Sequence, residues 1–141
     1  MRRGATLSEV ILAITILGLL LGISLPRMAA FRDSLAVDEA AHRLQGASRK
    51  ARVAAILTSQ IIELTVAADS LVIRPAAGTV PLWRSPGPSG EKIALSGGPK
   101  RILFSPVGIA MGVSNASFRL TRGTAARTVV VSRLGRVRIL R

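Results

Sequence analysis

The sequence has no cysteine, no tyrosine and a single histidine, and aromatic residues make up only 3% of its 141 residues. Without cysteine the fold does not rely on disulfides, and no metal-ligand cluster can be assembled from histidine and cysteine. The histidine, His42, lies in a stretch with helical periodicity, where such a side chain is usually solvated or packed. No glycine-rich segment matches a phosphate-binding loop. We therefore expect that the protein is not an enzyme and has no catalytic residue, no bound metal and no cofactor.

Acidic residues are also scarce. Seven Asp and Glu oppose twenty Lys and Arg, which gives a formal net charge of +13 and a pI near 12.0. Such a charge suits nucleic acid, an anionic membrane surface or an acidic protein as a partner, although a GC-rich genome also favours Arg and Ala. No acid follows Glu91, and we expect Glu91 and Glu63 to be isolated surface residues. The last fifty residues carry ten positive side chains: Lys92, Lys100, Arg101, Arg119, Arg122, Arg127, Arg133, Arg136, Arg138 and Arg141.

One long apolar run lies near the N-terminus. The 21 residues from Ala5 to Leu25 contain a single ionisable side chain, Glu9. A helix of that length is about 31 Å long, close to a bilayer core of about 30 Å. An ordinary transmembrane anchor explains the length but not the acid, because a charge inside a membrane helix costs roughly 2.5–3.5 kcal/mol near its centre. A secretory signal peptide would explain Arg2-Arg3, but no good small-x-small cleavage site follows the run.

The segment Gly4-Ala5-Thr6-Leu7-Ser8-Glu9-Val10 resembles the type IV prepilin signature, in which a basic leader ends in glycine and a glutamate follows five residues into the mature chain. The sequence departs from that signature at Ala5 and Ser8, where bulkier apolar residues are usual. The resemblance implies cleavage after Gly4 by prepilin peptidase and N-methylation of Ala5. It also implies that Glu9 pairs with the freed amine of a neighbouring subunit. A buried charge pair of this kind gives register more than stability, as a filament requires.

A helical pattern continues after Pro26, which we expect to kink the helix rather than end it. Small apolar residues then recur at steps of three and four, and they form one narrow stripe. We predict one helix from about Ala5 to Ser59, with its first half in the membrane or a filament core and its second half packed on a globular domain. The predicted stripe consists of Val37, Ala40, Ala41, Leu44, Ala47, Ala51 and Ala54.

The period then changes to two, which is typical of strands. The segments 61–66 and 71–74 read as a hairpin, and 75–90 reads as a turn-rich loop with Leu82-Trp83 packed back onto the core. Glycine and proline turns separate the later segments. We predict further strands at 92–95, 101–104, 116–121, 127–132 and 136–140.

The C-terminal half resembles the GspH/FimT minor pilins through three motifs in order: Phe104-Ser105-Pro106-x-Gly108, Phe118-x-Leu120, and 129–138 with Gly135-Arg136-Val137-Arg138. The resemblance implies an α+β, type IV pilin-like fold, in which a long N-terminal transmembrane helix continues into a helix packed on an antiparallel β-sheet domain. The expected division is leader 1–4, transmembrane or filament-core helix 5–25, amphipathic helix 26–59 and β-sheet domain 60–141.

The same resemblance implies a single-pass protein of the bacterial inner membrane, with its C-terminal domain in the periplasm and later in a periplasmic or surface filament. Its expected partners are other pilins or pseudopilins, prepilin peptidase and the inner membrane. The machine served is a type II secretion pseudopilus or a type IV pilus. An unprocessed membrane-anchored domain unrelated to filaments remains a weaker alternative.

Three arginines at the C-terminal end suggest a further partner. Strand alternation sends Val137 and Ile139 toward the core, so Arg136 and Arg138 should face solvent, and a turn at Gly135 should bring Arg133 beside them. Arginine suits bidentate contact with phosphate, so double-stranded DNA is an alternative partner, as for a DNA-uptake pilin. A solvated strand face without a ligand is the other interpretation. Because aromatic residues are rare, DNA binding would be driven by the phosphate backbone, non-specific and salt-sensitive.

Overall fold

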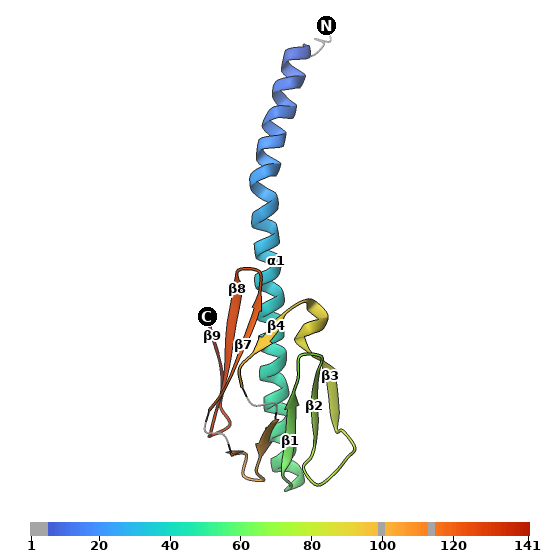
Figure 1. Cartoon of the computed structure of the whole chain (residues 1–141), viewed down its shortest axis with the longest axis vertical. Coiled ribbons are helices and arrows are strands. Elements are labelled where there is room, and N and C mark those ends of the chain that lie inside the picture. The colour runs from blue at the N-terminus through green and yellow to red at the C-terminus, as the bar shows by residue number, and fades with distance from the viewer. Residues whose placement is uncertain (1–5, 99–100, 113–114) are drawn as a thin grey trace. The chain divides into compact units, whose positions relative to one another are not determined.

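The structure is a computed structural model that describes residues 6–98, 101–112 and 115–141, with the backbone but not the side chains of residues 23–26. One helix, α1 (Leu7–Thr58), precedes all the strands (Figure 1). The chain divides into two compact units, Met1–Arg32 and Asp33–Arg141, and α1 contributes to both. The strands that follow are β1 (Ile62–Val66), β2 (Ser70–Pro75), β3 (Trp83–Pro86), β4 (Ala94–Ser96), β5 (Arg101–Phe104), β6 (Ala110–Met111), β7 (Asn115–Arg122), β8 (Ala125–Ser132) and β9 (Val137–Leu140), with a 3-10 turn η1 (Pro88–Glu91) after β3.

The first part of α1 exposes large aliphatic side chains on all its described sides. These side chains remain exposed among the described residues, and by length and composition the helix could cross a membrane. The helix continues through position 26, so Pro26 does not end it. The exposed side chains are Leu7, Val10, Ile11, Leu12, Ile14, Ile16, Leu17, Leu19, Leu20 and Leu21.

The second part of α1 buries a narrow stripe of small residues. Six of the seven predicted positions are buried, but the last buried position is Ala55 rather than Ala54, which lies at the edge of the stripe and is only partly buried. Ala55 lies closer to the stripe than Ala54, because four residues after Ala51 come nearer to a full helical turn of about 3.6 residues than three residues do. Because most of these residues are alanine, the helix backbone can approach the sheets closely. The buried residues are Val37, Ala40, Ala41, Leu44, Ala47, Ala51 and Ala55.

Two antiparallel sheets share one core with this stripe. The first sheet has the order β3-β2-β1-β5-β6, and the second has the order β4-β7-β8-β9. Alternate side chains of β7 (Ala116, Phe118 and Leu120) are buried, while those between them face outward. The expected α+β fold, with a long N-terminal helix and an antiparallel sheet domain, is confirmed.

The segment 75–90 differs most from the prediction. It was expected to be a loop, but Trp83–Pro86 forms β3 on the edge of the first sheet, paired with β2. Trp83 packs against the core as predicted, whereas Leu82 is exposed. The predicted strand 92–95 begins later, at Ala94, because Lys92 has a positive φ of 57° that closes η1. Strand β6 was not predicted.

Candidate functional sites

Glu9 lies in the first turn of α1, three residues after Thr6. The Thr6 hydroxyl accepts a hydrogen bond from the Glu9 backbone N–H at 3.3 Å, and the Thr6 carbonyl accepts one from Val10. Thr6 therefore caps the helix, and the positive end of the helix dipole favours the Glu9 carboxylate. Within residues 6–98, 101–112 and 115–141 that carboxylate has no ion pair. Gly4 and Ala5, the predicted cleavage and methylation positions, lie outside the described residues.

The acids on the second part of α1 are paired. Arg122 Nε lies 2.8 Å from Asp33 Oδ1. Arg127 contacts both carboxylate oxygens of Asp38, with its Nε 2.6 Å from Oδ1 and its Nη2 3.1 Å from Oδ2. These pairs connect the helix to the two central strands of the second sheet. They also reduce the unbalanced positive charge counted in the last fifty residues, because Arg122 and Arg127 are paired with acids that precede them by about ninety residues.

Glu91 is not the isolated surface acid that was expected. Arg43 donates to Glu91 at 2.6 Å and to Glu39 at 2.9 Å, which joins α1 to the 3-10 turn η1. The hydrogen bond to Glu91 raises the pKa of Arg43 above its ordinary value, and burial opposes that shift. Arg43 therefore stays charged and bridges two acids that lie far apart in the sequence.

Glu63 is likewise not an isolated surface residue. Its side chain on β1 is 8% exposed, and it accepts hydrogen bonds from Arg74 at 2.7 Å and Thr65 at 3.0 Å, with Arg101 at 4.0 Å. Burial acts to raise the pKa of Glu63, but the hydrogen bonds from Arg74 and Thr65 outweigh it and hold that pKa below its ordinary value. Of the seven acids, only Glu9 and Asp69 then lack an ion pair among the described residues.

The C-terminal arginines lie on and beside the turn between β8 and β9. Gly135 has a φ of 72°, and its N–H closes this turn by donating to the Ser132 carbonyl at 2.8 Å. The Ser132 N–H in turn donates to the Arg136 carbonyl. Arg136 and Arg138 are exposed, and they line a shallow hollow of about 320 Å³ together with Val130, Ser132 and Leu134. Val137 and Ile139 are partly buried against the core, as the alternation predicted.

Arg133 is exposed but does not line this hollow, so the structure brings together two of the three predicted arginines rather than all three. Instead, the Arg133 carbonyl accepts a hydrogen bond from Ala110 and ties the turn to β6. A third cation on the same outer face is Arg119 of β7, which is exposed and pairs in register with Thr128. Its alternation with the buried Phe118 and Leu120 could have identified it from the sequence.

The turns at Gly108 and Gly135 lie against each other and against Arg52. A Cβ on Gly135 would lie 2.7 Å from the Gly108 carbonyl oxygen, and one on Gly108 would lie 2.9 Å from Arg52 Nε. That Nε is buried and has no hydrogen-bond partner within the described residues. Gly135 is therefore required for close approach of the two turns as well as for its own backbone conformation.

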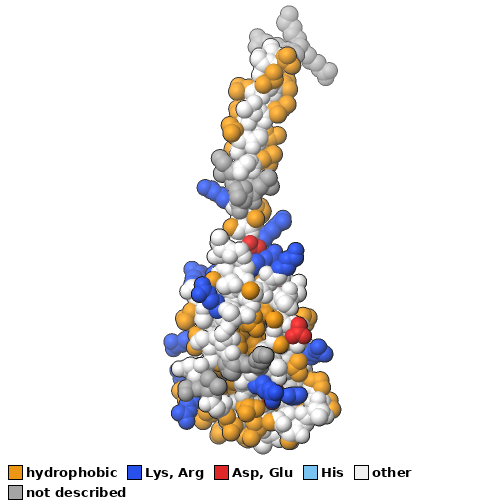
Figure 2. Space-filling model, in the orientation of Figure 1, with side chains coloured by type: hydrophobic (Ala, Val, Ile, Leu, Met, Phe, Trp, Pro, Cys, Tyr) orange, Lys and Arg blue, Asp and Glu red, His pale blue; other side chains and the backbone are white. Residues whose placement is uncertain are grey.

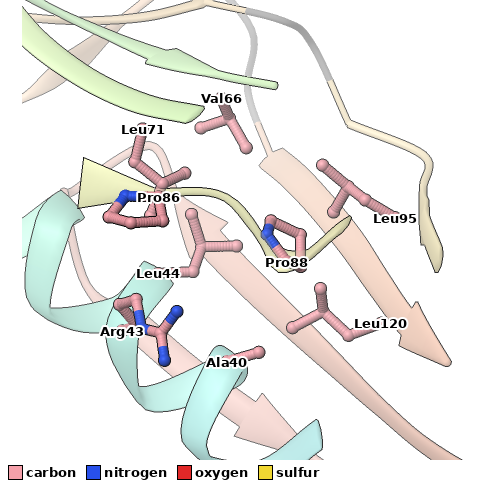
Figure 3. Close-up of a pocket in the computed structure, with 9 residues that line it drawn as sticks. All are labelled: Ala40, Arg43, Leu44, Val66, Leu71, Pro86, Pro88, Leu95 and Leu120. Atoms are coloured by element: carbon pink, nitrogen blue, oxygen red, sulfur yellow. The ribbon is translucent and has the colours of Figure 1, made fainter. Parts of the chain in front are cut away.

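The core itself offers no ligand site among the described residues. A cavity between α1 and the sheets has a volume of only about 10 Å³, and its walls are apolar apart from Arg43 (Figure 3). That is about one water molecule's room, so it is a packing gap. Among the described residues no group of three or more His, Cys, Asp or Glu could hold a metal ion. The cavity is lined by Ala40, Arg43, Leu44, Val66, Leu71, Pro86, Pro88, Leu95 and Leu120.

Comparison with known proteins gives three results. Residues 40–135 match the family described as type II transport protein GspH. The chain is 34% identical over 157 aligned positions to the pilin-like protein PilA1 of Thermus thermophilus, and the alignment covers 98% of both proteins. Two crystal structures of the type IV minor pilin FimU of Pseudomonas aeruginosa match with TM-scores of 0.62 and 0.65. Both are 18% identical to this chain, of which each covers 74%, with 92% and 88% of the FimU chains aligned. At that identity the FimU likeness shows the fold alone.

Proposed function

The chain belongs to the family of type II transport protein GspH, and we propose that it is a minor pilin or pseudopilin that assembles into a type II secretion pseudopilus or a type IV pilus. Prepilin peptidase cleaves it after Gly4, and the new amine of Ala5 is methylated. Before assembly, residues 5–25 anchor it in the bacterial inner membrane with the β-sheet domain in the periplasm. Other pilins or pseudopilins are its partners in the filament.

Glu9 is the observation that carries this proposal. It is an acid without an ion pair among the described residues, at the start of a helix whose aliphatic side chains are exposed around it. The other acids of α1 are paired with arginines of the domain. A lone carboxylate in apolar surroundings requires a counter-charge, and the freed amine of a neighbouring subunit supplies one.

Intact-mass analysis of the membrane-extracted protein tests the processing step. The expected mass is that of a chain beginning at Ala5 with one added methyl group. A matched Gly4→Val variant, which removes the glycine before the cleaved bond, should keep the leader. A mature N-terminus at Met1 or near Ala30 in the wild-type chain would refute the proposal.

DNA uptake is a second candidate function, favoured by the hollow beside Arg136 and Arg138. Both arginines are exposed and have no carboxylate partner among the described residues, and Ser132 contributes to the same lining. Arg119 adds a cation to the same outer face. This arrangement suits the phosphates of a DNA backbone and carries no means of reading bases.

The DNA candidate is tested by the salt dependence of duplex binding. Each phosphate neutralised contributes about −0.9 to the slope of log affinity against log salt, so contacts from Arg119, Arg136 and Arg138 give a slope of about −3. Replacing Arg136 and Arg138 by Gln should flatten that slope by about two. The control replaces Arg49 and Lys50 on α1, since general electrostatics would respond equally to either pair. Equal effects, or no binding near about 50 mM salt, would exclude this candidate.

A further inference from the structure

Three connecting segments lie at the same end of the first sheet. Ile62, the first residue of β1, pairs with Pro75 at the end of β2 and with Phe104 at the end of β5. The chain before β1, the β2–β3 connection and the β5–β6 connection therefore all lie at this end. We call their exposed aliphatic side chains the apolar end; it consists of Leu57, Ile61, Val80, Leu82, Val107 and Ile109.

The apolar end is unlike the rest of the domain in charge. Segments 57–61, 76–82 and 105–109 contain no charged residue, although 19% of the whole chain is charged. Leu57 is 78% exposed, Val107 75% and Val80 74%. Figure 2 shows hydrophobic side chains gathered at the lower end of the domain, with Lys and Arg side chains just above them. Monomeric proteins rarely expose contiguous apolar surface of this kind unless it binds something.

Three cations border the apolar end without a carboxylate partner among the described residues. Arg52 lies against the turn at Gly108, and the Arg133 carbonyl bonds the Ala110 N–H. The third cation is Lys50, whose Nζ lies 4.7 Å from the centre of the Trp83 ring. Trp83 directly follows Leu82 of the apolar end. An apolar centre with a charged rim is the usual composition of a protein–protein interface. Here the described rim is positive.

We propose that the apolar end docks another filament subunit that presents an apolar surface bordered by acidic residues. A second copy of this chain does not fit, because two positive rims would meet. A bilayer in place of a subunit would give adducts to lipid in a crosslinking experiment. This inference rests on the proposed function, because it takes the partner from the filament.

Photo-crosslinking of the full chain in filament-forming cells tests the inference. The benzophenone amino acid is placed at Val80, at Val107, or at the control position Leu140, an exposed aliphatic residue at the far end of β9 from the Gly135 turn. We expect adducts from Val80 and Val107 to one pilin-like subunit, at a peptide flanked by Asp or Glu. Adducts only to lipid, only to a second copy, or in equal yield from Leu140 would overturn the proposal, as would none.

Charge variants sharpen the test. Val107→Asp should lower the yield from Val80 about tenfold, because a carboxylate would be buried in an apolar contact. Arg133→Glu should lower it several-fold while Arg133→Lys preserves it. Arg141→Glu, which follows β9 at its end remote from the Gly135 turn, should leave it unchanged. The three substituted side chains are exposed, so the fold is kept.

Filament content, measured in the same cells, separates this inference from the function on which it rests. If the wild-type chain is missing from purified filaments, the proposed function fails. If the chain is present and the probes at Val80 and Val107 give no subunit adduct, only the docking surface fails.

Discussion

The two parts of α1 treat their apolar and acidic side chains in opposite ways. Before Arg32, large aliphatic side chains are exposed, and Glu9, the one acid there, has no ion pair with any residue that the structure describes. From Asp33 onward, small apolar side chains are buried, and Asp33 and Asp38 are paired with arginines of the second sheet. The second part finds its partners within its own chain. The first part therefore requires partners from outside it.

The sizes of the side chains explain why one helix can serve both environments. Burying one exposed Leu or Ile contributes roughly 1.5–3 kcal/mol, which strongly favours lipid or neighbouring helices around residues 7–21. Alanine contributes less, but it allows the backbone of the second part to lie close to the sheets. The helix-to-domain ion pairs then set the rotation of that part, since each involves a different strand or turn.

The largest expected effect comes from removing the charge of Glu9, the acid that distinguishes the first part of α1 from the second. Glu9→Gln keeps the shape of the side chain and removes its charge, so membrane insertion should persist or improve, because a charge in the span costs roughly 2.5–3.5 kcal/mol near its centre. Assembly should fall at least about tenfold, because the partner amine loses its counter-charge. The ratio of filament-bound to membrane-bound protein measures this.

Glu39→Gln is the matched control for Glu9→Gln. Glu39 is also an acid of α1, but it lies on the domain part, where its side chain is 70% exposed and pairs with Arg43. An exposed pair of this kind contributes little, so assembly should be unchanged. If Glu9→Gln enters filaments as efficiently as Glu39→Gln, the acid does not act through its charge.

A second substitution tests how tightly the domain part is packed. Gly135→Ala combines a positive φ with a Cβ only 2.7 Å from the Gly108 carbonyl oxygen, so it should destabilise the domain by about 2–4 kcal/mol. Gly112→Ala has a similar φ of 90° but open space around it, and should cost about 1 kcal/mol. Thermal unfolding of the full chain in detergent, followed by Trp83 fluorescence, compares the two. Equal losses would mean that the close approach does not matter.

A third test uses pH. Because the pKa of Glu63 is lower in the folded state than its ordinary 4.5, its stabilising contribution is complete above that value and is lost as the pH falls through the folded pKa. Glu63→Gln should therefore cost about 1–2 kcal/mol at about pH 7 and progressively less as the pH falls below the ordinary value of 4.5. Asp69→Asn, which removes an acid without an ion pair in the described part of the chain, is the control. An unchanged cost of Glu63→Gln in acid would contradict the linkage.

The sequence predicted what depends on local periodicity and missed what depends on distant partners. The small-residue stripe, the first hairpin and the outward-facing Arg138 follow from periods of 3.6 and 2. Glu91 was misjudged because its partner, Arg43, lies 48 residues away. Nothing in the pattern of either segment indicates that contact.

The candidate sites show the same division. The glycine-to-glutamate spacing singles out Glu9 from the local sequence alone, and the role of Glu9 in assembly stays a prediction. By contrast, the count of ten C-terminal cations overstated the basic surface, because Arg122 and Arg127 are paired with acids of the helix. The apolar end was also invisible in the sequence, since its three segments meet only through the strand order of the first sheet.

The smallest expected effect comes from one substitution made in both parts of α1. Added Cβ atoms at Gly22 and Gly46 would both meet open space, so neither alanine clashes with a side chain that the structure describes. Gly46→Ala should stabilise the domain by about 0.5–1 kcal/mol, because alanine loses less backbone entropy in a helix, and raise its midpoint by about 2–4 °C. Gly22→Ala should leave that midpoint unchanged.

Gly22 lies four residues after Gly18, so both are on one face, where small residues allow helices in a membrane to approach closely. Gly22→Ala should therefore lower filament content while Gly46→Ala does not. If Gly22→Ala instead shifted the unfolding midpoint as much as Gly46→Ala, the two parts of the helix would share one cooperative unit, and their contrast would be wrong.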